Sequence, residues 1–307
     1  MSLNQDSQDQ QYNYVDPTKF WVTISTPFIA NALWFILAQL KRDNGIVDIM
    51  WGLLFVIPNL TYLWWSNNWN HRSILVFSLI ALWAARLSTH IAMRHEGKED
   101  YRYVAMRKRW EKKGQTYYYF AAFFYIFVLQ AFFSLIVNAS ALHVSFYSMK
   151  QNEQLTGLDY AGAAVFIIGF LFQAAADASL YAFKRDPANK GKIIKHNVWR
   201  YSRHPNYFGE SLMWWGIYLI SCNIGKGYLT FYSALFITLL VRFVSGVPLL
   251  ERKQKKNPEF LKYMKETNVF VPWFHRNISP QEESLIDQQF EDNQSKQNYD
   301  AASDKKD

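Results

Sequence analysis

The densest group of chemically capable side chains begins at Arg203. Arg203 and His204 come directly before Pro205, and proline is favoured in a first helical turn because its missing N–H would be unpaired there anyway. Asn206 and Glu210 then lie one turn apart on the same helical face. A helix N-terminus flanked by cationic side chains attracts anions. Nucleotide phosphates would therefore fit here, and the amide and carboxylate would suit a ribose or an amide group.

Three further polar sets lie inside or at the ends of apolar runs, where ionisable groups are costly and indicate function. Each set shares one helical face: Arg86, His90 and Arg94; Asp177, Tyr181 and Lys184; and Asp48 with Asn44 and Trp51. Each also has a structural interpretation. Arg94 can extend to the membrane surface, Asp177 and Lys184 can balance charge at a helix end, and Asp48 can cap its helix.

Seven apolar runs position these side chains. They cover residues 20–40, 46–65, 73–93, 117–148, 158–183, 208–224 and 228–250 of the 307-residue chain, which is 50% hydrophobic. A membrane-spanning helix needs about 20 mainly apolar residues, and only the run from 208 is clearly weaker. The sequence predicts an all-α integral membrane bundle of about seven transmembrane helices. We expect a polar N-terminal tail (1–19), one membrane domain (20–278) and a disordered polar tail (279–307).

The formal charge of +8 is distributed unevenly among the segments between the runs. Lysine and arginine concentrate after the first, third, fifth and seventh runs, as the positive-inside rule expects. The charge therefore marks one side of a membrane and does not indicate nucleic-acid binding. The single cysteine, Cys222, excludes an internal disulfide and a multi-thiolate metal site, and no metal is expected. An uncleaved first span favours the endoplasmic reticulum, with a mitochondrial inner membrane or a bacterial plasma membrane as alternatives.

The run from Ser202 to Glu210 resembles the signature of the steroid 5-alpha-reductase-like membrane reductase superfamily. Further elements resemble its uncharacterised branch: 48–52, Arg86 with His90 and Arg94, 99–103, Gln130, Phe183 with Lys184, 248–252, Tyr263, Thr267, Phe270 and Pro272. The resemblance covers about residues 44–274. It implies a helical membrane fold that binds NADPH in a cavity open to the cytoplasm.

The resemblance also implies roles for individual residues. The cofactor-binding set would be Arg94, Arg102, Asp177, Tyr181, Lys184, Arg203, His204, Asn206, Tyr207 and Glu210. Within it, Asn206 and Glu210 would contact the nicotinamide end, Asp177 and Lys184 the ribose and phosphates, and the arginines with His204 the remaining phosphate charge. Asp48 and His90 take the positions where steroid reductases use a glutamate and a tyrosine, so we expect them to be catalytic.

The implied reaction is reduction of a C=C bond in a lipid-like substrate: a steroid, a sterol, an enoyl compound or an isoprenoid. The Asp48 and His90 departure counts against a 3-oxo-steroid. Two alternatives remain open. An S-adenosylmethionine-dependent methyltransferase of the isoprenylcysteine or phospholipid type shares the Arg-His-Pro-x-Tyr-x-x-Glu pattern, and a non-enzymatic membrane subunit would keep the fold without chemistry. The expected partners are the substrate and membrane lipids, and the oligomeric state is left open.

Overall fold

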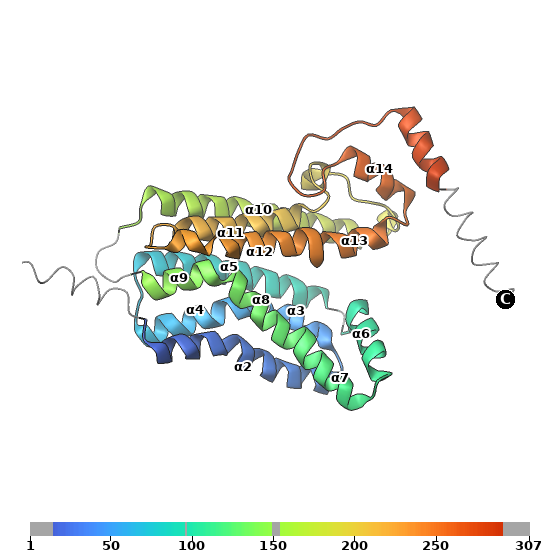
Figure 1. The fold of residues 1–307 in the computed structure, drawn as a ribbon. Coiled ribbons are helices and arrows are strands. Elements are labelled where there is room, and N and C mark those ends of the chain that lie inside the picture. Colours follow the sequence, from blue (N-terminus) through green and yellow to red (C-terminus); the bar gives the residue numbers. More distant parts are fainter. Residues whose placement is uncertain (1–14, 96, 149–153, 291–307) are drawn as a thin grey trace, which may run out of the picture. The chain divides into compact units, whose positions relative to one another are not determined.

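The computed structural model describes residues 15–95, 97–148 and 154–290, and these form helices and no strand (Figure 1). The all-α prediction is therefore confirmed for this part of the chain. The chain divides into two compact units, where the sequence predicted one membrane domain. Unit 1 comprises Met1–Phe166 and Trp214–Phe236, and unit 2 comprises Ile167–Met213 and Ile237–Asp307. The two units are interleaved in sequence because three helices contribute residues to both.

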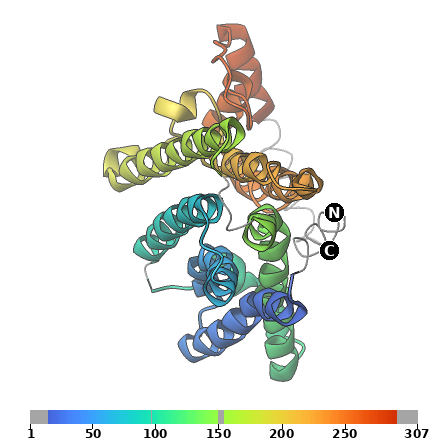
Figure 2. The ribbon, with the colours of Figure 1, turned by 90° about the vertical axis from the view of Figure 1, so that its left-hand side faces the viewer.

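Helices account for both units. Those wholly in unit 1 are α2 (Pro17–Lys41), α3 (Val47–Met50), α4 (Leu53–Ser66), α5 (His71–Arg94), α6 (Tyr101–Glu111), α7 (Gln115–Ala122), α8 (Leu129–Val137) and α9 (Ala139–Tyr147). The shared helices are α10 (Gly157–Arg185), α11 (Pro205–Ser221) and α12 (Phe231–Leu239), and unit 2 adds α13 (Val247–Gln254) and α14 (Pro258–Glu266). Within unit 1, α2 packs against α4 and α8 (Figure 2).

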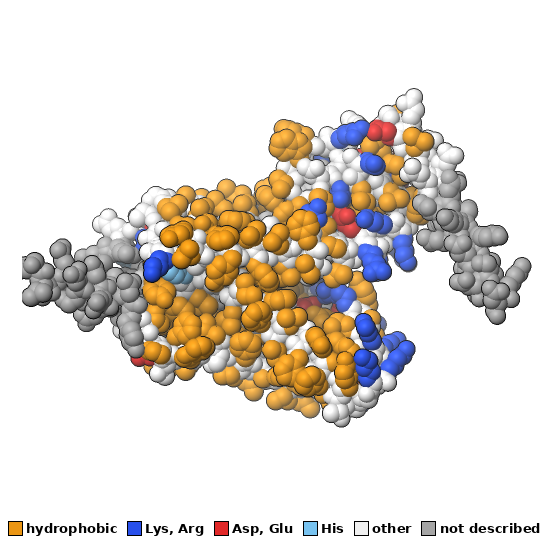
Figure 3. Space-filling model, viewed as in Figure 1, with side chains coloured by type: hydrophobic (Ala, Val, Ile, Leu, Met, Phe, Trp, Pro, Cys, Tyr) orange, Lys and Arg blue, Asp and Glu red, His pale blue; other side chains and the backbone are white. Residues whose placement is uncertain are grey.

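Five helical segments among the described residues are long and apolar enough to cross a membrane. They are Pro17–Lys41, His71–Arg94, Gln115–Val137, Gly157–Arg185 and Gly227–Gln254, and Asn44–Met50 with Leu53–Ser66 make a sixth if a pair bent by 48° is one span. The chain is thus a multi-pass membrane protein. Hydrophobic side chains cover its helices, while lysine and arginine gather over α6 (Figure 3). Seven spans are not confirmed, because α11 has only 17 residues, fewer than the roughly 20 that a span needs.

Buried polar side chains stabilise a helix break in unit 1. Between α8 and α9, the Asn138 side chain donates a hydrogen bond to the carbonyl of Phe55 (3.2 Å). Asn59 donates to Asn138 Oδ1 (3.0 Å), and the Ser145 hydroxyl donates to Asn59 Oδ1 (2.7 Å). Such hydrogen bonds avoid the cost of unpaired polar groups in apolar surroundings. The predicted run 117–148 is therefore two helical segments, Gln115–Val137 and Ala139–Tyr147, that meet at Asn138.

Residues 280–290 are helical, so the prediction of a disordered tail from residue 279 is wrong for this stretch. Ser279 and Glu282 form a reciprocal cap, with the Glu282 N–H donating to Ser279 Oγ (3.2 Å) and the Ser279 N–H donating to Glu282 Oε2 (3.0 Å). Lys262 also forms ion pairs with Glu283 (2.8 Å) and Asp287 (3.0 Å). The Ser-x-x-Glu spacing is a helix-start signal visible in the sequence. Residues 291–307, and residues 1–14 of the predicted N-terminal tail, lie outside the described residues.

Candidate functional site

Helices α10 and α11 make a very close approach in unit 2, at Gly169 and Gly209. A Cβ atom added to Gly169 would lie 2.6 Å from the carbonyl oxygen of Gly209, and one added to Gly209 would lie 2.5 Å from that of Gly169. A Cβ added to Gly209 would also lie 2.7 Å from the backbone nitrogen of Gln173. Only glycine allows two backbones to come this close. The crossing fixes which side chains of the two helices face each other.

Four polar side chains, which we call the polar ladder, follow from this crossing: Gln173, Asp177, Asn206 and Glu210. Gln173 Nε2 donates to Glu210 Oε2 (3.4 Å), and one turn along, Asn206 Nδ2 donates to Asp177 Oδ1 (3.3 Å). Gln173, Asp177 and Glu210 are only 3%, 9% and 8% exposed. The structure thus brings together three residues that the sequence selected and adds Gln173, which lies one turn before Asp177 on the same apolar helix. That spacing was the signal that could have found it.

Two other predicted cofactor residues of α10 lie further along the helix. The Tyr181 hydroxyl accepts from Arg185 Nη1 (3.4 Å), and the Arg185 guanidinium lies 5.4 Å from the centre of the Tyr181 ring. Lys184 is exposed near the end of the helix. These two exposed residues lie near the end of α10 and do not belong to the polar ladder. A contact with cofactor phosphates stays a prediction for both.

Arg203 and His204 share one buried carboxylate, Glu251 of α13, and we call these three residues the clamp. Arg203 Nε donates to Glu251 Oε1 (2.9 Å), and His204 Nε2 lies 3.1 Å from the same oxygen. Arg203 Nη1 also donates to the carbonyls of Met264 (3.1 Å) and Thr267 (2.6 Å), at the end of α14. The sequence predicted that Arg203 and His204 bind phosphate. The structure places both side chains against Glu251, and Arg203 also against the end of α14, while their contact with phosphate stays a prediction.

Hydrogen bonds to backbone carbonyls also join the residues before α11 to the C-terminal segment 263–270. The Arg203 N–H donates to the Asn268 carbonyl (2.8 Å), and the Ser202 hydroxyl donates to the Phe270 carbonyl (2.7 Å). The Tyr263 hydroxyl donates to the carbonyls of Trp199 and Ser202. These partners are 61 to 68 residues apart in the sequence. These hydrogen bonds fix the residue from which α11 starts, and therefore the position of Asn206.

His204 also positions the predicted cofactor residue Tyr207. The two rings lie nearly parallel, with an interplanar angle of 15° and centroids 5.8 Å apart. Burial lowers the pKa of His204, and Arg203 and Arg242 lower it further, whereas the hydrogen bond to the Glu251 carboxylate and its charge raise it. The His204 ring thus contacts the Tyr207 ring on one side and forms a hydrogen bond with Glu251.

In unit 1, Asp48 is the centre of a second polar group, the Asp48 network, formed with Asp100, Arg102 and Tyr103. The Tyr103 hydroxyl donates to Asp48 Oδ1 (2.6 Å), and Arg102 Nη2 donates to Asp48 Oδ2 (3.0 Å). Arg102 Nε also donates to Asp100 Oδ1 (2.9 Å), and Asp100 caps the start of α6. Arg102, predicted to bind the cofactor, thus pairs with the two carboxylates. Asp48 gains a tyrosine partner that the sequence did not select.

Tyr103 is suited to hold a proton beside Asp48. Its side chain is 8% exposed. Burial raises the pKa of Tyr103 well above its ordinary value, and the Asp48 charge raises it further, because both disfavour a phenolate. The hydroxyl therefore stays protonated at physiological pH. No local spacing in the sequence links Asp48 and Tyr103, since 55 residues separate them.

Two nearby contacts hold the turn between α2 and α3, the helix that carries Asp48. Asp43 Oδ2 lies 2.8 Å from His95 Nε2, and the Asn44 N–H donates to Glu99 Oε1 (2.8 Å). The remaining predicted residues of this unit lie on α5, where His90 Nε2 is 3.5 Å from Arg94 Nη1. Their roles in catalysis and cofactor binding stay predictions.

Comparison with known proteins places these groups in a family without assigning chemistry. A family described as "Protein of unknown function (DUF1295)" matches residues 34–267. An uncharacterised protein of Schizosaccharomyces pombe is 25% identical over 286 residues, covering 84% of this chain and 81% of that protein. No solved structure matches. The matched segment contains the polar ladder, the clamp and the Asp48 network.

Proposed function

The chain belongs to the DUF1295 family of proteins of unknown function, and we propose that it is a membrane-embedded, NADPH-dependent reductase of a C=C bond in a lipid-like substrate. The polar ladder is the observation that carries this proposal. Two carboxylates and two amides gathered on facing helices are costly to bury. Their donors and acceptors match the carboxamide of nicotinamide and the hydroxyls of a ribose.

The residues present fit the cofactor by the chemistry of this donor set. Asn206 and Glu210 would hold the carboxamide, which both donates and accepts hydrogen bonds, and Asp177 would accept from ribose hydroxyls. Exposed Lys184 would supply charge for a phosphate. NADPH, when bound, supplies the hydride. The resemblance of the run 202–210 to steroid 5-alpha-reductase-like enzymes supports the same assignment.

The Asp48 network would supply the acid that the reduction needs. Reduction of an enone develops negative charge on the carbonyl oxygen, and a positioned acid lowers that barrier. The Tyr103 hydroxyl has one proton and donates it to Asp48 in this structure, so as the acid it would turn that O–H from Asp48 to the carbonyl oxygen of the substrate. We therefore assign the acid role to the pair of Asp48 and Tyr103. The catalytic role of His90 stays a prediction.

Binding of the cofactor is the direct test. The purified full-length protein in detergent is heated with NADPH, NADH or S-adenosylmethionine, and its melting temperature is measured. We expect NADPH to raise the melting temperature most, because only a ligand that binds the folded state stabilises it. Stabilisation by S-adenosylmethionine alone would favour the methyltransferase alternative. No shift with any of the three would favour a non-enzymatic subunit.

Replacing Tyr103 by phenylalanine tests the proton donor. We expect kcat for NADPH oxidation to fall by about 10²–10⁴-fold, the usual contribution of a general acid, while the Kd for NADPH stays unchanged. The assay uses a panel of enone, enoyl and isoprenoid-enal lipids as acceptors. Tyr125→Phe is the control, since Tyr125 is 60% exposed. Wild-type turnover in the Tyr103 variant would remove this residue from the mechanism.

A further inference from the structure

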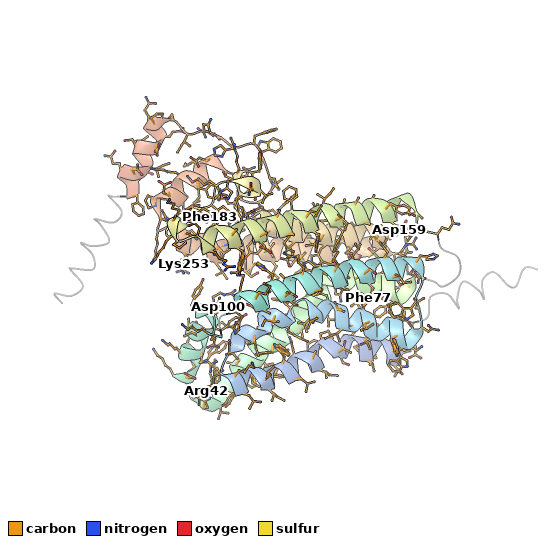
Figure 4. All side chains as sticks on the ribbon, turned by 180° about the vertical axis from the view of Figure 1, so that it is seen from behind. Arg42, Phe77, Asp100, Asp159, Phe183 and Lys253 are labelled. Atoms are coloured by element: carbon orange, nitrogen blue, oxygen red, sulfur yellow. The ribbon has the colours of Figure 1, made fainter. Side chains whose placement is uncertain are left out.

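A polar cavity of about 490 Å³ lies in unit 1, bounded by the end of α2, the approach to α6, and the turn between α6 and α7. This volume is within the range of about 300–1,000 Å³ typical of small-ligand sites. None of its lining residues belongs to the Asp48 network. Figure 4 shows Arg42, one of those residues, at the end of α2. We call it the α6–α7 cavity.

The inner wall of the α6–α7 cavity is a fully bonded polar network. Arg107 makes two hydrogen bonds to Glu99, at 2.8 and 2.9 Å, and its guanidinium lies 5.2 Å from the centre of the Tyr118 ring. The Tyr118 hydroxyl donates to Gln39 Oε1 (2.8 Å) and accepts from the Asn44 side chain (3.1 Å). Such a network holds its members in place. The wall is therefore preorganised without a ligand.

The outer rim is different, because it carries opposite charges that do not bond to each other. Arg42 and Glu111 both line the cavity and are exposed. Within residues 15–95, 97–148 and 154–290, neither side chain forms a hydrogen bond or an ion pair. Gln115 lines the same rim with its amide also unbonded in this part of the chain. The rim thus offers a cationic donor, an amide and a carboxylate to a ligand.

The cavity lies at the depth of lipid headgroups. Arg42 directly follows the candidate span Pro17–Lys41, and Gln115 is the first residue of the candidate span Gln115–Val137. Both therefore lie where an apolar segment meets the polar membrane surface. The basic side chains that gather over α6 (Figure 3) mark the same side of the membrane as Arg42. Tyr119 on the rim is typical of aromatic residues at this level.

We propose that the α6–α7 cavity binds the headgroup of a zwitterionic phospholipid of the phosphoethanolamine type. The phosphate would bind Arg42 and Gln115, and the ammonium would donate to Glu111. A purely anionic headgroup would satisfy Arg42 but be repelled by Glu111, whereas a zwitterion satisfies both charges. The site does not depend on the reductase assignment.

Lipid binding to the full-length protein tests this site. The delipidated protein in detergent is titrated with phosphatidylethanolamine or with phosphatidylglycerol of the same acyl chains, and bound lipid is counted by native mass spectrometry. We expect one phosphatidylethanolamine to bind preferentially. Arg42→Gln should weaken it by about tenfold or more, as expected for loss of a charged hydrogen bond. Glu111→Gln should abolish the preference over phosphatidylglycerol.

Controls separate this site from general membrane adhesion. Lys41→Gln removes a neighbouring charge that does not line the cavity, and it should leave binding unchanged. Soluble glycerophosphoethanolamine should bind far more weakly than the intact lipid, because the acyl chains hold the lipid at the cavity. Equal binding of both lipids by the wild type, unchanged binding in Arg42→Gln, or tight binding of the soluble headgroup would each overturn the proposal.

Discussion

Replacing Glu210 by alanine should weaken NADPH binding by about 10–100-fold, because hydrogen bonds to a charged group contribute roughly 1.5–3 kcal/mol. Glu210 is buried in the polar ladder, where Gln173 donates to it. The change also leaves the Gln173 amide without this acceptor. The Kd is measured by fluorescence titration of the purified protein.

Two companion variants make the Glu210 result specific. Glu210→Gln keeps the shape and one acceptor oxygen, so its Kd should fall between those of the wild type and Glu210→Ala. Lys256→Ala removes an exposed charge outside the ladder and should leave the Kd unchanged. If Glu210→Ala retains its melting temperature and binds NADPH normally, the ladder is not the cofactor site.

Glu251→Ala should destabilise unit 2 by about 3–5 kcal/mol, the usual cost of leaving one partner of a buried ion pair alone. Arg203 and His204 would both lose their shared carboxylate. Because Arg203 also binds two carbonyls at the end of α14, the C-terminal segment should loosen first. The measurements are the melting temperature and hydrogen exchange of residues 258–274.

Glu259→Ala is the matched control for Glu251. Glu259 is 55% exposed on the neighbouring helix, and its ion pairs with Lys195 and Lys262 are 3.6 and 3.7 Å long. Exposed pairs of this kind contribute about 0–1 kcal/mol. A Glu251 variant as stable as the Glu259 variant would show that the clamp is not needed for folding.

Local patterns in the sequence were sufficient for most of the helices. The runs 20–40, 73–93 and 158–183 match Pro17–Lys41, His71–Arg94 and Gly157–Arg185 to within a few residues. Hydropathy could not reveal the 48° bend between α3 and α4, since the two helices together pass as one apolar segment. It also could not reveal the π-helical turns Phe123–Val128 and Leu240–Val244.

In the candidate site, too, the sequence predicted groupings within one helix but not contacts between residues far apart in the sequence. Asp177, Asn206 and Glu210 were selected from helical spacing, and the structure brings them together. Arg203 and His204 were predicted to bind phosphate from their place before a helix N-terminus, and their contact with Glu251, 48 and 47 residues away, gave no local signal. Spacing along one helix cannot show that a distant carboxylate neutralises a charge. The same limit concealed the pairing of Tyr103 with Asp48.

The glycine crossing of α10 and α11 has a mechanical consequence. Sliding α11 by one residue would shift it by about 1.5 Å and turn it by about 100°, placing Phe208 or Glu210 where only Gly209 fits. In the segment of unit 2 that contains Gly169 and Gly209, the two helices therefore cannot slide past each other. Any motion that admits or releases a ligand has to occur in other parts of the chain. Because the backbones of α10 and α11 are fixed here, the ligand preference of the polar ladder can change only through substitution of its side chains.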